Sequence, residues 1–381
     1  MSGRLERYKL AKDNRLAGKF NGAPIFYRFP RLGKIVPTIP RGKQITTVAG
    51  NGLGKSQSVI GITIMPIYNI IKTKGYKAHF YIALLEDPLE LFEDRLFCHI
   101  LYDKHGISID PMYLNSMREA LPTDSIEKYF KEVDEIVEDV LSYCTIVTSI
   151  YTATGLYMWL KTESTKLGEH HMKDHKFEYK NPDGSKFYEV KPIYSHYVPN
   201  DPELHNIVIV DNLNNLAEEY DKTLQRSLTV RDAMGKWARD YARLQICKHW
   251  NWTVWNIMQT ALEYDKKEFT AFRGEQIIEK TEPTLNALGD NKVVSRDFHL
   301  IFALYSPSRF GIKRYEGYNI ERLGDAFRAL IILKSNFSQS NVKLPLFFHG
   351  ACSYYLELPI PEKLTDEKYN QITKLQTIQY E

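Results

Sequence analysis

The stretch AGNGLGKS, residues 49–56, combines three glycines with a lysine and a serine at a spacing that suits phosphate binding. The glycines let the backbone curl so that its N–H groups point inward at phosphate oxygens. Lys55 can reach the β and γ phosphates of a nucleoside triphosphate, and the Ser56 hydroxyl can enter the shell of a Mg²⁺ ion. We therefore predict ATP and Mg²⁺ as ligands, held by Ala49, Gly50, Asn51, Gly52, Leu53, Gly54, Lys55, Ser56 and Gln57.

The residues around this loop predict the structure that a phosphate-binding P-loop needs. Ile45 to Val48 is a short β-branched run that favours a strand, and Gln57 to Lys72 is apolar at helical spacing. A helix that begins directly after the loop presents the positive end of its dipole to the phosphates. The usual first glycine of the pattern is Ala49 here, a mild departure because that position ends the strand.

Three polar residues end apolar runs that we expect to be strands. Asp211 follows IVIV and is predicted to hold Mg²⁺ through water, although an isolated Asp there is more often a helix cap. Glu86 follows HFYIALL and could deprotonate an attacking water; the alternative is an acid that merely begins a helix. Gln259 could sense the γ-phosphate, or be an ordinary amide at a strand end.

The bulk composition is that of a folded protein with a full core. The 381 residues are 43% hydrophobic and 25% charged, with a net charge of +3 that neither requires nor excludes a nucleic-acid partner. No apolar run is long enough for a membrane span, and no secretion signal is visible. We predict reduced cysteines and a cytoplasmic location, because Cys98, Cys144, Cys247 and Cys352 are far apart in apolar stretches.

Strands alternate with helices along most of the chain, which predicts an α/β fold with a mainly parallel central sheet and an antiparallel C-terminal edge. We expect an arm of little regular structure at 1–43, one ATPase domain at 44–358 and a tail at 359–381. The turn sequence NPDG predicts a β-hairpin insertion at about 167–205. Its His170, His171 and His175 fit a solvated loop better than a metal site.

In the order of these elements the chain resembles the RecA-like motor domain of replicative DnaB-type helicases. The resemblance covers roughly residues 35–358. It implies a RecA-like P-loop NTPase core. Besides the P-loop it rests on ALLEDPLELFEDRL, IVIVDNLNNL, NWTVWNIMQT, LNALGDNKVVSRDFHLIFALYSP and ALIILKSNFSQSNVKLPLFFHG.

The resemblance also implies roles for single residues. Glu86 would be the catalytic base, Asp211 the magnesium-shell acid and Gln259 the sensor, and Lys334 would reach the nucleotide of the adjacent subunit. An arginine follows that lysine by two positions in the family, whereas this chain has Asn336. Either Lys334 or another arginine, such as Arg309 or Arg314, takes its place, or hydrolysis is weak.

The family's DNA-facing loops correspond here to 212–226 and 264–280. The second loop interleaves cations with aromatic residues, which suits single-stranded DNA, although a solvated charged loop fits equally well. We expect a DNA-acting ATPase in a homo-oligomer, plausibly a hexameric ring. The rivals are a regulatory or packaging ATPase without unwinding activity and a recombinase-type filament. The loop residues that prompt this expectation are Lys266, Lys267, Phe269, Phe272, Arg273 and Lys280.

Overall fold

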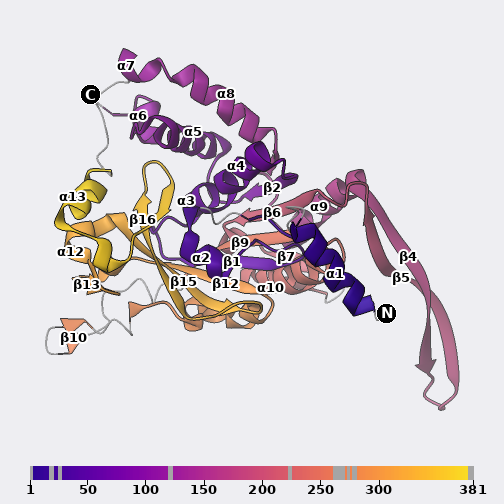
Figure 1. Cartoon of the computed structure of the whole chain (residues 1–381). Coiled ribbons are helices and arrows are strands. Elements are labelled where there is room, and N and C mark those ends of the chain that lie inside the picture. The colour runs from indigo at the N-terminus through magenta and orange to yellow at the C-terminus, as the bar shows by residue number, and fades with distance from the viewer. Residues whose placement is uncertain are drawn as a thin grey trace.

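A computed structural model of the chain contains a twisted central sheet with helices on both faces (Figure 1). The structure describes residues 3–16, 21–24, 28–118, 123–221, 225–260, 271–272, 275–276 and 281–375. Within these residues the sheet has nine strands in the order β17-β16-β15-β12-β1-β9-β6-β2-β3. The strands are β1 (Gln44–Ala49), β2 (Ala78–Leu84), β3 (Cys144–Val147), β6 (His205–Asp211), β9 (Thr253–Gln259), β12 (Leu300–Tyr305), β15 (Phe327–Ser335), β16 (Val342–His349) and β17 (Tyr354–Glu357).

The six strands from β12 to β3 are mutually parallel, and β15, β16 and β17 extend the sheet antiparallel at one edge. Parallel register aligns the carboxyl ends of the central strands, because Ala49 pairs with Gln259, and Leu84 pairs with Asp211. These carboxyl ends therefore lie together along one side of the sheet. The predicted α/β fold, its parallel sheet and its antiparallel C-terminal edge are confirmed.

Both faces of the sheet are buried, which explains why its strands are continuous apolar runs rather than alternating ones. In β6, Ile207 and Ile209 join the core on one face, whereas Val208 and Val210 join the core on the other. The helices of the first face are α2 (Pro30–Ile35), α3 (Lys55–Ser58), η2 (Val59–Ile64), α4 (Met65–Lys74), α5 (Leu89–His105), α6 (Pro111–Leu114), α7 (Asp124–Glu127) and α8 (Phe130–Leu141).

The second face is covered mainly by helices that follow β3 and β6 in the chain. They are α9 (Ala153–Leu167), η3 (Leu213–Asn215), α10 (Val230–Lys236), η4 (Trp237–Cys247), η6 (Leu285–Arg296), η7 (Pro307–Phe310), α12 (Ile320–Leu323), η8 (Gly324–Ala326) and α13 (Asp366–Lys374). Among the described residues, no helix is both long and apolar enough to cross a membrane.

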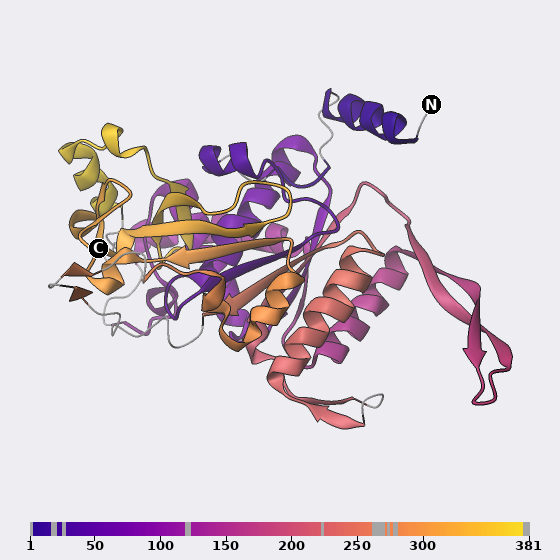
Figure 2. The same cartoon turned by 90° about the horizontal axis from the view of Figure 1, so that it is seen from below.

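A long hairpin of β4 (Gly168–Lys180) and β5 (Lys186–Pro199) leaves the body between α9 and β6 (Figure 2). It lies within the predicted insertion at about 167–205, and the predicted β-hairpin is confirmed. Shorter two-stranded pairs are β7 (Glu219–Asp221) with β8 (Arg226–Leu228), β10 (Ala271–Phe272) with β11 (Glu275–Gln276), and β13 (Arg314–Tyr315) with β14 (Tyr318–Asn319).

The two chain ends contain more regular structure than their sequences suggest. The prediction of little regular structure in residues 1–43 was wrong, because α1 (Gly3–Leu16) and α2 lie there. The apolar side chains around α2 enter the core, which stabilises a helix as short as this one. At the other end, η9 (Pro361–Lys363) and α13 lie in the predicted tail, and Tyr369 of α13 is buried.

Candidate functional site

The loop between β1 and α3 has the curled backbone expected of a phosphate cradle. Gly52 and Gly54 take positive φ angles of 67° and 97°, which favour glycine. A Cβ atom on Gly54 would lie 2.2 Å from the Tyr355 hydroxyl, so this position has no room for a side chain. The helical run that starts at Lys55 continues through η2 and α4 to Lys74 and directs its positive dipole end at the loop.

Two residues of the antiparallel edge hold the carbonyl groups of this loop. The buried Arg328 guanidinium in β15 donates from Nε to the Leu53 carbonyl oxygen at 3.1 Å. The Tyr355 hydroxyl in β17 donates to the Gly54 carbonyl oxygen at 2.8 Å. Carbonyls fixed on this side favour a loop whose N–H groups face phosphate oxygens on the other.

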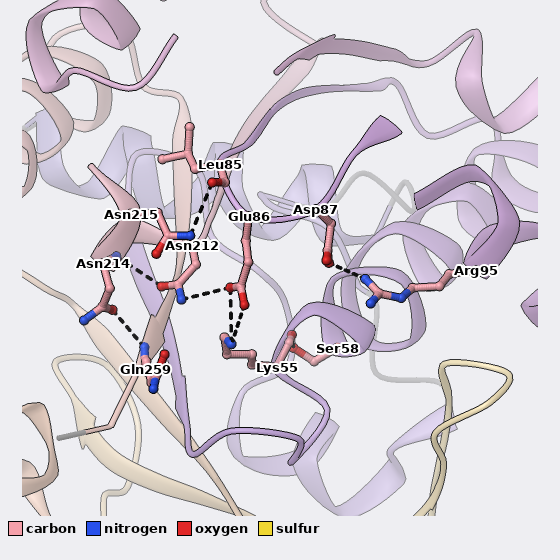
Figure 3. A network of polar contacts seen from close by, with 10 residues as sticks. All are labelled: Lys55, Ser58, Leu85, Glu86, Asp87, Arg95, Asn212, Asn214, Asn215 and Gln259. Carbon is pink, nitrogen blue, oxygen red and sulfur yellow. Dashed lines mark hydrogen bonds and ion pairs between the residues drawn. The ribbon is translucent and has the colours of Figure 1, made fainter. Parts of the chain in front are cut away.

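Lys55 and Glu86 form an ion pair at the centre of the site, with 3.3 Å between Lys55 Nζ and Glu86 Oε1 (Figure 3). Lys55 is only 7% exposed, whereas 37% of the Glu86 side chain is exposed, so the carboxylate is open to water. Asn212 Nδ2 donates to the other Glu86 oxygen at 3.1 Å. Glu86 lies two residues beyond the end of β2, not directly at its end as we expected, and the turn aims it at the P-loop lysine.

Asp211, the last residue of β6, is buried beside Ser56. Burial raises the pKa of its carboxyl group to about 7; the Ser56 hydroxyl bond and Lys55 oppose that shift, and Glu86 and Asp87 reinforce it. Within the part of the chain that the structure describes, Asp211 Oδ1 is buried without a hydrogen-bond partner.

This pairing of Asp211 and Ser56 fits a Mg²⁺ ion. An orphaned carboxylate oxygen next to a hydroxyl supplies oxygen ligands, and Mg²⁺ takes most of its remaining shell from water and substrate phosphates. Among the described residues no group of three His, Cys, Asp or Glu is close enough to hold a metal. The predicted magnesium residues, Ser56 and Asp211, are thus brought together, and phosphate oxygens would have to complete the shell.

Asparagines that follow β6 connect Glu86 to Gln259 through hydrogen bonds (Figure 3). The Asn214 backbone N–H donates to Asn212 Oδ1 at 3.1 Å, and Asn214 Oδ1 accepts from the Gln259 backbone N–H at 2.9 Å. Asn215 donates to the Leu85 carbonyl oxygen at 3.3 Å. The turn after β6 therefore ties the end of β9 to the segment that carries Glu86.

A pocket of about 420 Å³ adjoins the P-loop on the side of β12. Gly50 and Leu53 line it together with Arg309, Tyr305 and Phe310. Its mixed apolar and cationic lining suits a nucleobase and ribose next to the phosphates. Arg309 contacts the P-loop of its own chain, since a Cβ on Gly52 would lie 2.8 Å from its guanidinium.

Lys334 is far from this cluster. Lys334 pairs in register with Ile301, near the start of β12. It therefore lies at the amino ends of the parallel strands, whereas the P-loop lies at their carboxyl ends. Its ammonium donates to the Ser295 carbonyl oxygen at 2.8 Å. Asn336 follows just beyond the end of β15. Three of the four predicted catalytic residues thus lie at the carboxyl ends of the parallel strands, namely Lys55, Glu86 and Gln259. Lys334 lies at the opposite ends.

The other residues singled out in the sequence have local partners. His170 shares a hydrogen bond with the Ser164 hydroxyl at 2.8 Å, and His171 stacks on His196. The four cysteines are free; three are buried and Cys144 is half-buried. Of the two predicted DNA-facing loops, 212–226 contains η3, β7 and the start of β8, whereas most of 264–280 lies outside the described residues.

Sequence reasoning missed Asn212, Arg328 and Tyr355. Asn212 could have been noticed as the polar residue directly after Asp211. Arg328 and Tyr355 carry no local signal, because they meet the P-loop across separations of 275 and 301 residues.

Comparisons with solved structures agree with this architecture. The chain is similar to the ATPase domain of G40P, with a TM-score of 0.61 and 13% identity over 94% of this chain and 100% of that one. It is similar to a DnaB-like replicative helicase, whose structure was described with its interactions with primase, with a TM-score of 0.60 and 12% identity over 92% of this chain and 67% of that one.

The fold is therefore the RecA-like fold of DnaB-type helicase ATPase domains. Identities this low show the fold alone. No protein-family model and no curated protein matches the chain.

Proposed function

We propose that this protein is a magnesium-dependent ATPase. The proposal rests on one observation. At the carboxyl ends of the parallel strands, next to the curled P-loop, four side chains lie together: Lys55, Ser56, Asp211 and Glu86. Ligands of α/β sheets bind at this edge, and a lysine, a hydroxyl and two acids match the needs of phosphoryl transfer.

The contacts suggest how each residue acts. When ATP enters, Lys55 turns from Glu86 to the β and γ phosphates, and Glu86 remains held by Asn212. The freed carboxylate oxygen then takes the proton of the attacking water. Ser56 and deprotonated Asp211 would hold Mg²⁺, which supplies positive charge to the transferring phosphoryl group. Gln259, tied to Asn214, would report the state of the γ-phosphate to the segment beyond β9.

The P-loop assignment is tested by Lys55→Ala. We expect ATP binding, measured by isothermal titration or with a fluorescent analogue, to be lost, because the cation that balances the β and γ phosphates is removed. Lys131→Ala, at an exposed position of α8, serves as the control and should bind ATP as wild type does. Unchanged ATP affinity in a folded Lys55→Ala variant would refute the assignment.

We further propose that the ATPase acts on single-stranded DNA as a cytoplasmic homo-oligomer. The fold similarity to a DnaB-like replicative helicase supports this, as does the position of the carboxyl ends of β6 and β9 on the side of the sheet where the nucleotide would bind. The second candidate is a regulatory or packaging ATPase of the same fold without unwinding activity. Asn336 favours it, because the family's arginine is missing at that position.

A further inference from the structure

The β4–β5 hairpin is a two-stranded arm that leaves the body on one side (Figures 1 and 2). Its foot is anchored: the Tyr197 hydroxyl donates to the Ser164 carbonyl oxygen at 2.9 Å, and His170 packs on Trp250. Its distal half is exposed. Among the described residues β4 and β5 pair only with each other, and a ribbon of two strands is marginally stable alone in water.

Apolar side chains are exposed on both faces of the distal half. Tyr179 and Phe187 are register partners and stack on one face, with ring centroids 5.1 Å apart. Tyr188 and Val190 are exposed by 51% and 61% on the opposite face. Only the exposed part of each side chain, between 37% and 61%, can still be buried by a partner, so the tip offers a small apolar contact on each face.

The charge of the arm indicates a protein partner rather than DNA. Residues 168–199 contain five lysines and five acidic residues, so the arm is neutral when its histidines are neutral. Several of these charges neutralise each other locally, as Lys186 does with Glu178 at 2.6 Å. A neutral surface gains little from phosphate neutralisation, which dominates binding to DNA.

An apolar pocket of about 440 Å³ opens at the foot of the same arm. Tyr76, His79 and Tyr143 line it, with Leu167 and Leu204 on either side of the hairpin. The two leucines are only half-buried, so the pocket opens at the surface. The tip and this pocket lie at opposite ends of the hairpin. A tip that fills such a pocket would therefore belong to another molecule.

The length of the arm is sufficient to reach a second copy of the chain. At about 3.4 Å per residue, the 13 residues of β4 span roughly 44 Å. A chain of 381 residues is expected to be about 54 Å across, from a radius of gyration of about 21 Å. The tip thus extends nearly one subunit width from its own pocket, so it can reach the pocket of a copy that packs alongside in the direction of the arm.

We propose that the β4–β5 hairpin is an assembly arm, whose tip inserts Tyr188 and Val190, which share one face of the ribbon, into the Tyr76–Tyr143 pocket of a second copy of the chain. Arm and pocket are different surfaces of one subunit, so the contact is head-to-tail and generates a ring or a filament. The inference rests on the proposed function only in that both require a homo-oligomer.

The first test shortens the arm without disturbing its foot. Replacing Lys176–Val190 with Asn-Gly joins His175 to Lys191, which are register partners, through a two-residue turn. Sedimentation should give an oligomer for wild type and a monomer for this variant. Tyr188→Ser with Val190→Ser should raise the dissociation constant about tenfold or more, whereas Tyr151→Ser, at an exposed aromatic residue outside the arm, should not.

The second test locates the contact by thiol cross-linking. Tyr188→Cys on one copy mixed with Lys77→Cys at the pocket of another should give a cross-linked dimer, and neither variant alone should do so at the same yield. A shortened variant with the wild-type mass, a monomeric wild type, or no mixed cross-link would overturn the proposal. ATP binding per chain distinguishes a failure of the assembly-arm proposal from a failure of the proposed ATPase function. Arm variants should bind ATP normally, and Lys55→Ala should still assemble.

Discussion

At the scale of single residues, Asp211 carries the most unusual environment in the site. Its carboxyl group is buried next to a serine hydroxyl and a lysine, with two further acids nearby, and its pKa is raised to about 7. A carboxyl group with such a raised pKa would have to lose its proton to bind Mg²⁺, so metal binding there would be coupled to proton release.

The sign of this shift gives a prediction. Between the pKa of an unfolded Asp, about 4, and about 7, the folded protein binds more protons than the unfolded chain, so the free energy of unfolding falls as pH rises. Asp211→Asn should remove this slope and make the nucleotide-free protein more stable than wild type at pH 8, by about 1–3 kcal/mol. Thermal unfolding at pH 5 and pH 8 measures it.

The affinity for Mg²⁺ should change with pH in the direction opposite to the stability of the nucleotide-free protein. The affinity of the ATP-bound wild type for Mg²⁺ should increase from pH 6 to pH 8, because Asp211 must lose its proton. Asp211→Asn should bind Mg²⁺ weakly at every pH. A variant that keeps both the pH slope of stability and the wild-type affinity for Mg²⁺ would contradict the assignment of Asp211.

At the scale of secondary-structure elements, the antiparallel edge does more than complete the sheet. It brings Arg328 and Tyr355 to the back of the P-loop, where they hold two consecutive carbonyl groups. The arginine also contacts the Phe348 ring at 4.5 Å and the Asp325 carboxylate at 2.8 Å, which fixes its position.

Tyr355→Phe should therefore weaken ATP binding several-fold and lower stability by about 1 kcal/mol, because the Gly54 carbonyl loses one of its two donors and keeps only the Ser58 N–H. Tyr318→Phe is a matched control: its buried hydroxyl donates to the Pro359 carbonyl oxygen at 2.7 Å, away from the nucleotide. The control should lose similar stability without a loss of affinity. Equal ATP affinities in the two variants would show that the contact does not shape the loop.

The strands were predictable because each is an apolar run bounded by turn residues, and the P-loop because its glycines and lysine are local in sequence. The hairpin followed from NPDG. The helix α2 was missed because it is short and depends on burial in the core. The hydrogen bond from Arg328 to the Leu53 carbonyl was missed because the two residues are brought together by the register of β12 with β15 and not by any local pattern.

At the scale of the whole molecule, Lys334 and Asn336 lie at the amino ends of the parallel strands, opposite the P-loop, so a direct contact with nucleotide would have to be made in an adjacent subunit. If the nucleotide lies at a subunit boundary, Asn336→Arg should supply a bidentate cation to the neighbour's γ-phosphate and raise turnover about tenfold or more. Lys334→Ala should lower turnover, and wild-type subunits should partly restore it in mixed oligomers. Steady-state turnover that neither substitution changes would exclude catalysis in trans.

The measurement that tests the central claim most directly is ATP turnover by wild type and by Glu86→Gln, with and without single-stranded DNA. We expect DNA to stimulate the wild type, and Glu86→Gln to bind ATP but hydrolyse it about 10²–10⁴-fold more slowly, since the base is gone. Glu90→Gln, an exposed acid in the first turn of α5, should behave as wild type. Bound ATP with turnover that neither DNA nor Glu86→Gln changes would contradict the proposed DNA-dependent ATPase and its assigned base.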